Sequence, residues 1–147
     1  MNREIKFRGK ALDKSLGWIF GDLIQMSEFF PIIQRFESTV LVKGEECRKF
    51  TQDKVHPETV GQYTGLNDKD GNPVYEGDIV DCDYILYDPW DDGKETLEPI
   101  RCVVEYDEFG FIFKKEEDLY HFLHDVKNIK VVGNIFDNPE LLEGGAK

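Results

Sequence analysis

The amino-acid sequence predicts a mainly β protein, and three observations carry that prediction. Residues 4–11 alternate charged side chains with apolar or small ones, which is the period of a strand with one face in solvent. The same alternation places apolar residues on one face at 80–86 and again at 100–106. Asp70-Gly71 is a typical tight-hairpin pair between two apolar segments. Strand should therefore exceed helix by a wide margin.

Composition limits the classes of protein that fit. A chain of 147 residues with 40% hydrophobic side chains can build the core of a single domain. The net charge of -12 should repel phosphate backbones and favours a basic partner or cations. No apolar run is long enough for a membrane span or signal peptide, so we expect a cytoplasmic protein. The three cysteines contain no Cys-x-x-Cys pair and are expected to be reduced.

The first part of the chain, residues 1–58, is predicted to be an amino-terminal β segment. Residues 4–24 form a plausible hairpin, with the basic side chains of its first strand sharing the solvent face. Residues 29–42 suit one or two short strands. Residues 44–58 are polar and contain a proline, which is typical of a connection. We place the boundary between the two sub-parts at its end.

The second part, residues 59–147, is predicted to contain strands and one helix. Strands at 60–66 and 74–80 flank a hairpin tip, and two longer strands follow, separated by an acidic loop from Asp88 to Glu98. Apolar residues at helical spacing predict a helix over 115–126. A strand at 129–136 and a helical turn from Pro139 close the chain. The predicted core faces contain Tyr63, Val80, Cys82, Tyr84, Val104, Tyr106, Phe113, Val132 and Ile135.

Five segments resemble the YopX-like proteins of phages and prophages. They are Arg3–Arg8, Thr59–Leu66, Asp68–Gly71, Tyr75–Val80 and Gly133–Leu142. The resemblance implies a carboxy-terminal SH3-like barrel with an additional amino-terminal β segment, in a phage or prophage accessory protein. The resemblance indicates no particular activity or cofactor and provides no catalytic residue to assign. The motif positions that we expect to be structural are Gly65, Asp70, Gly71, Glu76, Gly77 and Asp78.

The segment Glu76-Gly77-Asp78 admits two interpretations. Its carboxylates, together with Asp81 and Asp83, could form the site of a small metal-dependent enzyme. Alternatively, Gly77 supplies an unusual backbone conformation and Asp78 hydrogen-bonds its own turn. Strand alternation places Asp78 on the opposite face from the other two aspartates, which favours the structural interpretation.

Other metal motifs are incomplete. His121 and His124 stand three apart on the predicted helix but have no third ligand at a recognisable spacing, so no zinc is expected. The hairpin tip at 67–72 resembles a calcium loop, yet its register lacks the leading ligand and the closing glutamate. The sequence therefore predicts no metal, no cofactor and no catalytic residue.

The acidic loop provides the candidate binding site, Trp90, Asp91 and Asp92. An aromatic residue among carboxylates at a loop tip can anchor a basic partner; the alternative is that Trp90 folds back to cap the core. We expect a non-enzymatic interaction module that acts in the bacterial cytoplasm. The alternatives are the metal-dependent enzyme and a mimic of DNA charge, while the basic first strand is a weaker candidate for nucleic-acid binding. Homo-oligomerisation through exposed strand edges is also considered.

Overall fold

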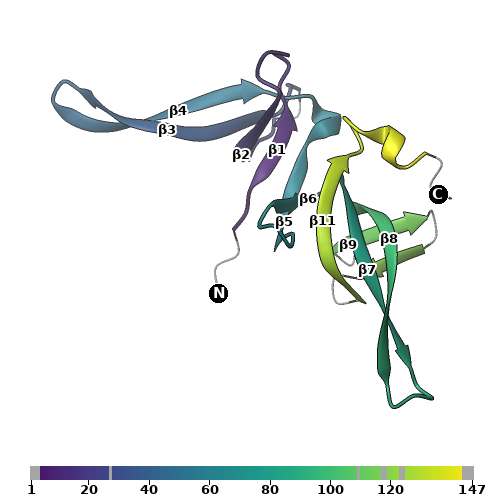
Figure 1. The fold of residues 1–147 in the computed structure, drawn as a ribbon. Coiled ribbons are helices and arrows are strands. Elements are labelled where there is room, and N and C mark those ends of the chain that lie inside the picture. Colours follow the sequence, from purple (N-terminus) through teal and green to yellow (C-terminus); the bar gives the residue numbers. More distant parts are fainter. Residues whose placement is uncertain (1–3, 27, 109, 117–118, 123–124, 144–147) are drawn as a thin grey trace. The chain divides into compact units, whose positions relative to one another are not determined.

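The computed structural model describes residues 4–26, 28–108, 110–116, 119–122 and 125–143. Strands dominate these residues, as the alternating pattern predicts. They form two antiparallel sheets, in the orders β4-β3-β2-β1-β5-β6 and β10-β9-β8-β7-β11 (Figure 1). The chain divides into two compact units, Met1–Tyr63 and Thr64–Lys147, and the division falls inside β5 (Gly61–Asn67).

The first unit begins with the predicted hairpin. Its strands are β1 (Phe7–Lys10) and β2 (Trp18–Ile24), followed by β3 (Ile32–Val42) and β4 (Glu45–Lys54). A small core gathers Ala11, Ile19, Ile33 and Val55, each at most 3% exposed. The core lies near the bases of the strands, because β3 pairs with β2 only from Ile32 to Gln34.

Two expectations for this unit are wrong. The polar stretch 44–58 is mostly the strand β4, which pairs with β3 along its whole length before a short 3-10 turn at Pro57–Thr59. Most of β4 is exposed on both faces, so it has no apolar alternation by which a strand could be recognised. The basic residues of β1 also do not share a solvent face. Arg8 is buried, with its guanidinium 4.7 Å from the ring centroid of Trp18.

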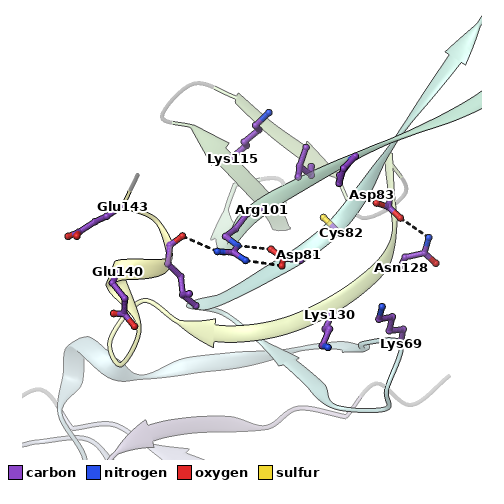
Figure 2. A pocket seen from close by; sticks show the side chains of 13 residues that line it. Lys69, Asp81, Cys82, Asp83, Arg101, Lys115, Asn128, Lys130, Glu140 and Glu143 are labelled. Atoms are coloured by element: carbon purple, nitrogen blue, oxygen red, sulfur yellow. Dashed lines mark hydrogen bonds and ion pairs between the residues drawn. The ribbon is translucent and has the colours of Figure 1, made fainter. Parts of the chain in front are cut away.

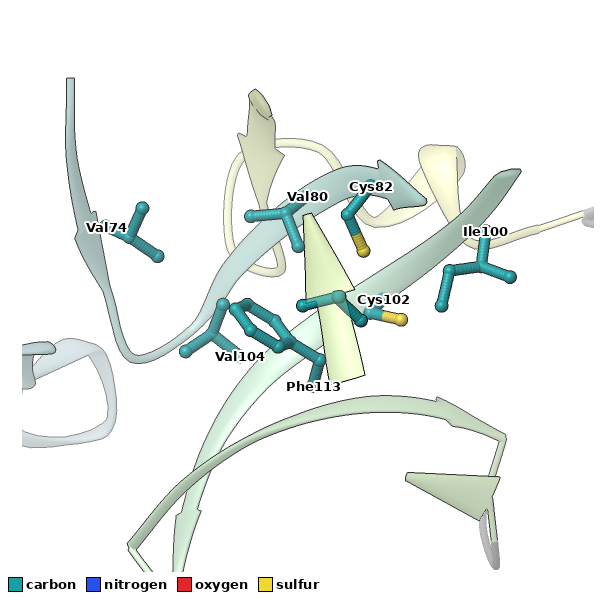
Figure 3. Close-up of a cluster of buried hydrophobic side chains, with 8 residues drawn as sticks. Val74, Val80, Cys82, Ile100, Cys102, Val104 and Phe113 are labelled. Carbon is teal, nitrogen blue, oxygen red and sulfur yellow. The ribbon is translucent and has the colours of Figure 1, made fainter. Parts of the chain in front are cut away.

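The second unit contains the larger core. Its strands after β5 are β6 (Pro73–Tyr75), β7 (Asp78–Asp88), β8 (Lys94–Asp107), β9 (Gly110–Glu116), β10 (Leu119–Phe122) and β11 (Val126–Asn134). Figure 3 shows how side chains from β6, β7, β8 and β9 meet in the buried cluster. Among the predicted core residues, Tyr63, Val80, Cys82, Val104 and Phe113 are buried.

The remaining core predictions differ in degree. Tyr84, Val132 and Ile135 are half-buried, whereas Tyr106 is 59% exposed. Strand β7 pairs with β8 only as far as Val103, so Tyr106 lies beyond the covered part of the strand. Its ring instead packs edge-on against Phe111, with centroids 4.9 Å apart.

The predicted helix over 115–126 is also wrong for the residues that the structure describes there, which exclude 117–118 and 123–124. Strand β9 continues to Glu116, and Leu119–Phe122 is the strand β10, which pairs with β9. Apolar spacing over so few residues is a weak signal, and pairing with a neighbouring strand overrides it. The second sheet keeps two end strands, so the described residues form no closed barrel. A short helical turn at Pro139–Leu141 is present as predicted. In the described ranges no helix has the length and apolar character of a membrane span.

Candidate functional site

The turn before β7 is held by its own side chain and backbone. Asp78 is 2% exposed, and its Oδ2 accepts a hydrogen bond from the backbone N–H of Tyr75 at 2.8 Å. Gly77 has a φ of 92°, a conformation that side chains disfavour. Its N–H donates to the carbonyl of Val104, and its carbonyl accepts from the N–H of Ile135. These contacts tie the Glu76-Gly77-Asp78 segment to β8 and to the chain following β11.

A polar pocket of about 690 Å³ lies beside β7 in the second unit. Arg101 donates from Nε and Nη2 to the two carboxylate oxygens of Asp81, at 2.6 and 2.9 Å, and from Nη1 to the carbonyl of Leu141 (Figure 2). Asp83 accepts a hydrogen bond from Asn128 at 2.9 Å. Both aspartates therefore already serve as acceptors for neighbouring side chains.

The structure places the carboxylates of the predicted alternative, a small metal-dependent enzyme, in different surroundings. Asp78 is buried in its turn, while Asp81 and Asp83 line the pocket beside their donors. Within the described residues, no three His, Cys, Asp or Glu side chains gather in a group that could hold a metal ion. His121 lies in β10 rather than on a helix, and His124 lies outside the described residues. The arrangement offers no ready coordination sphere.

The hairpin tip between β5 and β6 depends on Asp68, which the sequence placed in this tip but not among the structural motif positions. Its Oδ1 accepts from the N–H groups of Asp70 and Asn72, and its Oδ2 accepts from the N–H of Val131 on β11. Burial raises the pKa of Asp68, but these hydrogen bonds outweigh it and hold the pKa below its ordinary value. Gly65 in β5 and Gly71 in the tip itself both have positive φ angles.

The β7–β8 arm, residues 85–97, is exposed from Leu86 to Leu97. Strand β11 pairs with β7 only as far as Tyr84, so from Ile85 onward β7 has β8 as its single neighbour among the described strands. Figure 1 shows the two strands continuing as a long ribbon. The predicted loop from Asp88 to Glu98 is thus shorter than expected, because Lys94 to Glu98 belong to β8.

The candidate residues occupy the tip of this arm. Trp90 is 93% exposed, so it does not fold back onto the core. The N–H groups of Trp90 and Gly93 donate to the side chain and carbonyl of Asp88, at 2.9 and 3.0 Å, which fixes the turn. Asp92 adopts a φ of 52°, and Asp91 lies 4.0 Å from the ammonium of Lys94.

Further residues of the arm extend the candidate surface. Leu86, Tyr87 and Leu97 are between 40% and 65% exposed, and the pairing of β7 with β8 places Leu97 opposite Ile85, next to Leu86. Exposed carboxylates surround them at Asp88, Asp91, Asp92, Glu95 and Glu98. Glu95 pairs with Lys127 of β11. The arm thus combines apolar and aromatic contact area with an excess of negative charge.

Comparison with known proteins identifies the family. The family described as YopX protein matches residues 6–143, most of the chain. The chain belongs to the YopX family. A comparison with curated proteins finds no match. Among solved structures, the crystal structure of protein EF1440 from Enterococcus faecalis is similar, with 21% identity and a TM-score of 0.56. The similarity covers 97% of this chain and 100% of that one. At this identity, it shows that this YopX-family member shares its fold with EF1440.

Proposed function

We propose that this YopX-family protein is a non-enzymatic interaction module whose β7–β8 arm binds a basic protein, in the setting of a phage or prophage. The observation that carries the proposal is the 93% exposure of Trp90 at the tip of the arm. Tryptophan is enriched among the residues that dominate binding energy at interfaces. Burial of such a large apolar surface by a partner lowers the free energy of the complex.

The charge of the arm defines the kind of partner. Asp88, Asp91, Asp92, Glu95 and Glu98 outnumber the one basic residue of the segment, Lys94. Complementary charge raises the rate at which partners meet and rejects partners of like charge. A surface rich in Lys or Arg, with an apolar pocket for the indole, would therefore fit the arm.

Two variants separate the roles of the indole and the carboxylates. Trp90→Ala should weaken binding by about 2 kcal/mol or more, the scale of an interface hot spot. Asp91→Asn with Asp92→Asn should mainly slow association and reduce its dependence on salt, because exposed charges act on encounter more than on dissociation.

The experiment captures bacterial host proteins on the immobilised chain and measures the affinity of each purified candidate by calorimetry. Phe29→Ala is the matched control, because Phe29 is 68% exposed in the first unit. A basic protein that binds wild type and Phe29→Ala but not Trp90→Ala supports the proposal. Equal binding by all three would refute it. Loss of binding only when several carboxylates are neutralised would favour the mimic of DNA charge instead.

A further inference from the structure

The β3–β4 arm, residues 35–50, belongs to the first unit, whereas the residues of the proposed binding surface belong to the second. Beyond Gln34, β3 has β4 as its single neighbour among the described strands. Figure 1 shows the two strands leaving the sheet as a ribbon. An isolated pair of strands is marginally stable in water, and a third or fourth strand normally completes such a structure.

The arm also leaves large apolar side chains uncovered. Phe36 and Phe50 pack edge-on, with centroids 5.9 Å apart, yet they are 56% and 45% exposed. Leu41 and Val42 are 73% and 51% exposed. Exposed apolar residues gathered on one element mark interaction surfaces more often than scattered ones do.

Strand β4 presents an open edge. It is the last strand of its sheet, and the register shift in the β3–β4 pair occurs between Phe36 and Ser38 of β3. Residues 45–54 contain no proline, and no bulge interrupts β4. Proline and bulges prevent a further strand from pairing, and β4 has neither; its charged side chains instead restrict pairing to a strand of complementary charge.

The sequence of this edge is complementary to itself. It reads Glu45-Glu46-Cys47-Arg48-Lys49, with acidic and basic residues placed symmetrically about the cysteine. We propose that β4 pairs antiparallel with β4 of a second copy of this chain, centred on Cys47. Glu46 then faces Arg48 of the second copy, and Glu45 faces its Lys49. Each of these attractions occurs twice across the two-fold axis.

Backbone geometry and charge together select this register. Residues directly opposite in an antiparallel pair must both be of the hydrogen-bonded or both of the non-hydrogen-bonded kind. When two copies of one strand pair, the two-fold axis must therefore pass between two identical residues that face each other, and not between successive residue pairs. Moving the centre by one residue would place Glu46 against Glu46 or Arg48 against Arg48, and like charges directly opposite are destabilising.

The local structure leaves these side chains accessible. Glu45, Glu46 and Arg48 are exposed and make no ion pair among the described residues, while Lys49 contacts Glu37 at 3.4 Å and is 58% exposed. Pairing would turn two ribbons into one four-stranded sheet. Centred on Cys47, the pairing extends over residues 45–49 of each copy, because β4 begins at Glu45.

The test is sedimentation equilibrium of the full chain over a wide concentration series. Wild type should form a dimer of twice 17.1 kDa. Arg48→Glu or Glu46→Arg should each weaken the dimer by about tenfold or more, because two contacts change from attraction to repulsion. Glu46→Arg combined with Arg48→Glu should restore it. A mixture of the two single variants should form a heterodimer in preference to either homodimer.

Cys47 gives an independent measure of the register. The thiols of the two copies lie opposite each other, so mild oxidation with diamide should cross-link wild-type chains rapidly. Thr39→Cys in a Cys47→Ser background is the matched control, because residue 39 lies on β3, away from the proposed axis, and should cross-link slowly. A monomer at every concentration, a dimer insensitive to the charge reversals, or equal cross-linking at both positions would overturn the proposal. The variants used here change the β3–β4 arm of the first unit, whereas Trp90 lies on the β7–β8 arm of the second unit. The two proposals can therefore fail independently.

Discussion

Asp68 accepts a hydrogen bond from the backbone N–H of Val131 at 3.1 Å, which joins segments 63 residues apart in the sequence. The neighbouring Lys69 N–H donates to the carbonyl of Ile129 at 2.8 Å. The hairpin tip between β5 and β6 is thereby attached to β11. A carboxylate that accepts from several backbone N–H groups stabilises the fold, because its removal would leave all of these donors without a hydrogen-bond partner.

We expect Asp68→Ala to destabilise the protein by about 1 to 3 kcal/mol, the cost of leaving partly buried N–H groups without an acceptor. The change removes the acceptor of Asp70, Asn72 and Val131. Asp70→Ala is the control, because its exposed side chain makes no hydrogen bond within the described structure. Urea unfolding measures both, and equal losses would contradict the role of Asp68.

The same carboxylate should make stability depend on pH. Because its folded-state pKa lies below the ordinary value of 3.8, its contribution is fully present above the unfolded pKa and is lost as pH falls through the folded pKa. Asp68→Asn has no such titration. The free energy of unfolding of wild type should therefore fall more steeply than that of Asp68→Asn as pH is lowered below about 4. Parallel curves would show that Asp68 does not titrate differently in the two states.

Truncation of Phe113 should reduce stability strongly, whereas truncation of Trp90 should leave it almost unchanged. Phe113 is fully buried in the second core, so Phe113→Ala should cost about 3 to 5 kcal/mol. Trp90 is almost fully exposed, and Trp90→Ala should change stability by no more than about 0.5 kcal/mol. Thermal melting of the two variants tests this. A large loss for Trp90→Ala would make its indole part of the folded core.

One thiol should react in the native protein and three after unfolding. Cys47 is exposed, whereas Cys82 and Cys102 are buried on adjacent strands. Burial keeps the reagent away from both thiols, and a hydrogen bond with Cys102 also raises the pKa of the Cys82 thiol. Titration with a chromogenic disulfide reagent, with and without denaturant, counts the thiols. Cys47→Ser should abolish the fast phase, and a second fast thiol would show that the core is open.

The outcome at two strands shows where sequence patterns work and where they do not. Strand β7 was predictable because Val80 and Cys82 are buried in a core while Asp81 between them is not. Strand β4 was not, because solvent bathes both faces of Glu45 to Phe50 and no alternation develops. Strand β4 is defined by its hydrogen bonds to β3, and this pairing cannot be recognised from the amino-acid composition of β4 alone.

The sequence by itself determined the dominance of strands, the hairpin at Asp70-Gly71, the family and the position of Trp90 on an acidic turn. The strands, the hairpin and the acidic turn depend on neighbours a few residues apart, whereas the family was indicated by the resemblance of five segments along the chain. Only the tertiary structure decided that Arg8 is buried against Trp18, that Leu119–Phe122 is a strand and that Asp68 reaches Val131. Those outcomes depend on partners brought together by folding, whose stabilising contacts override the preference of the local segment.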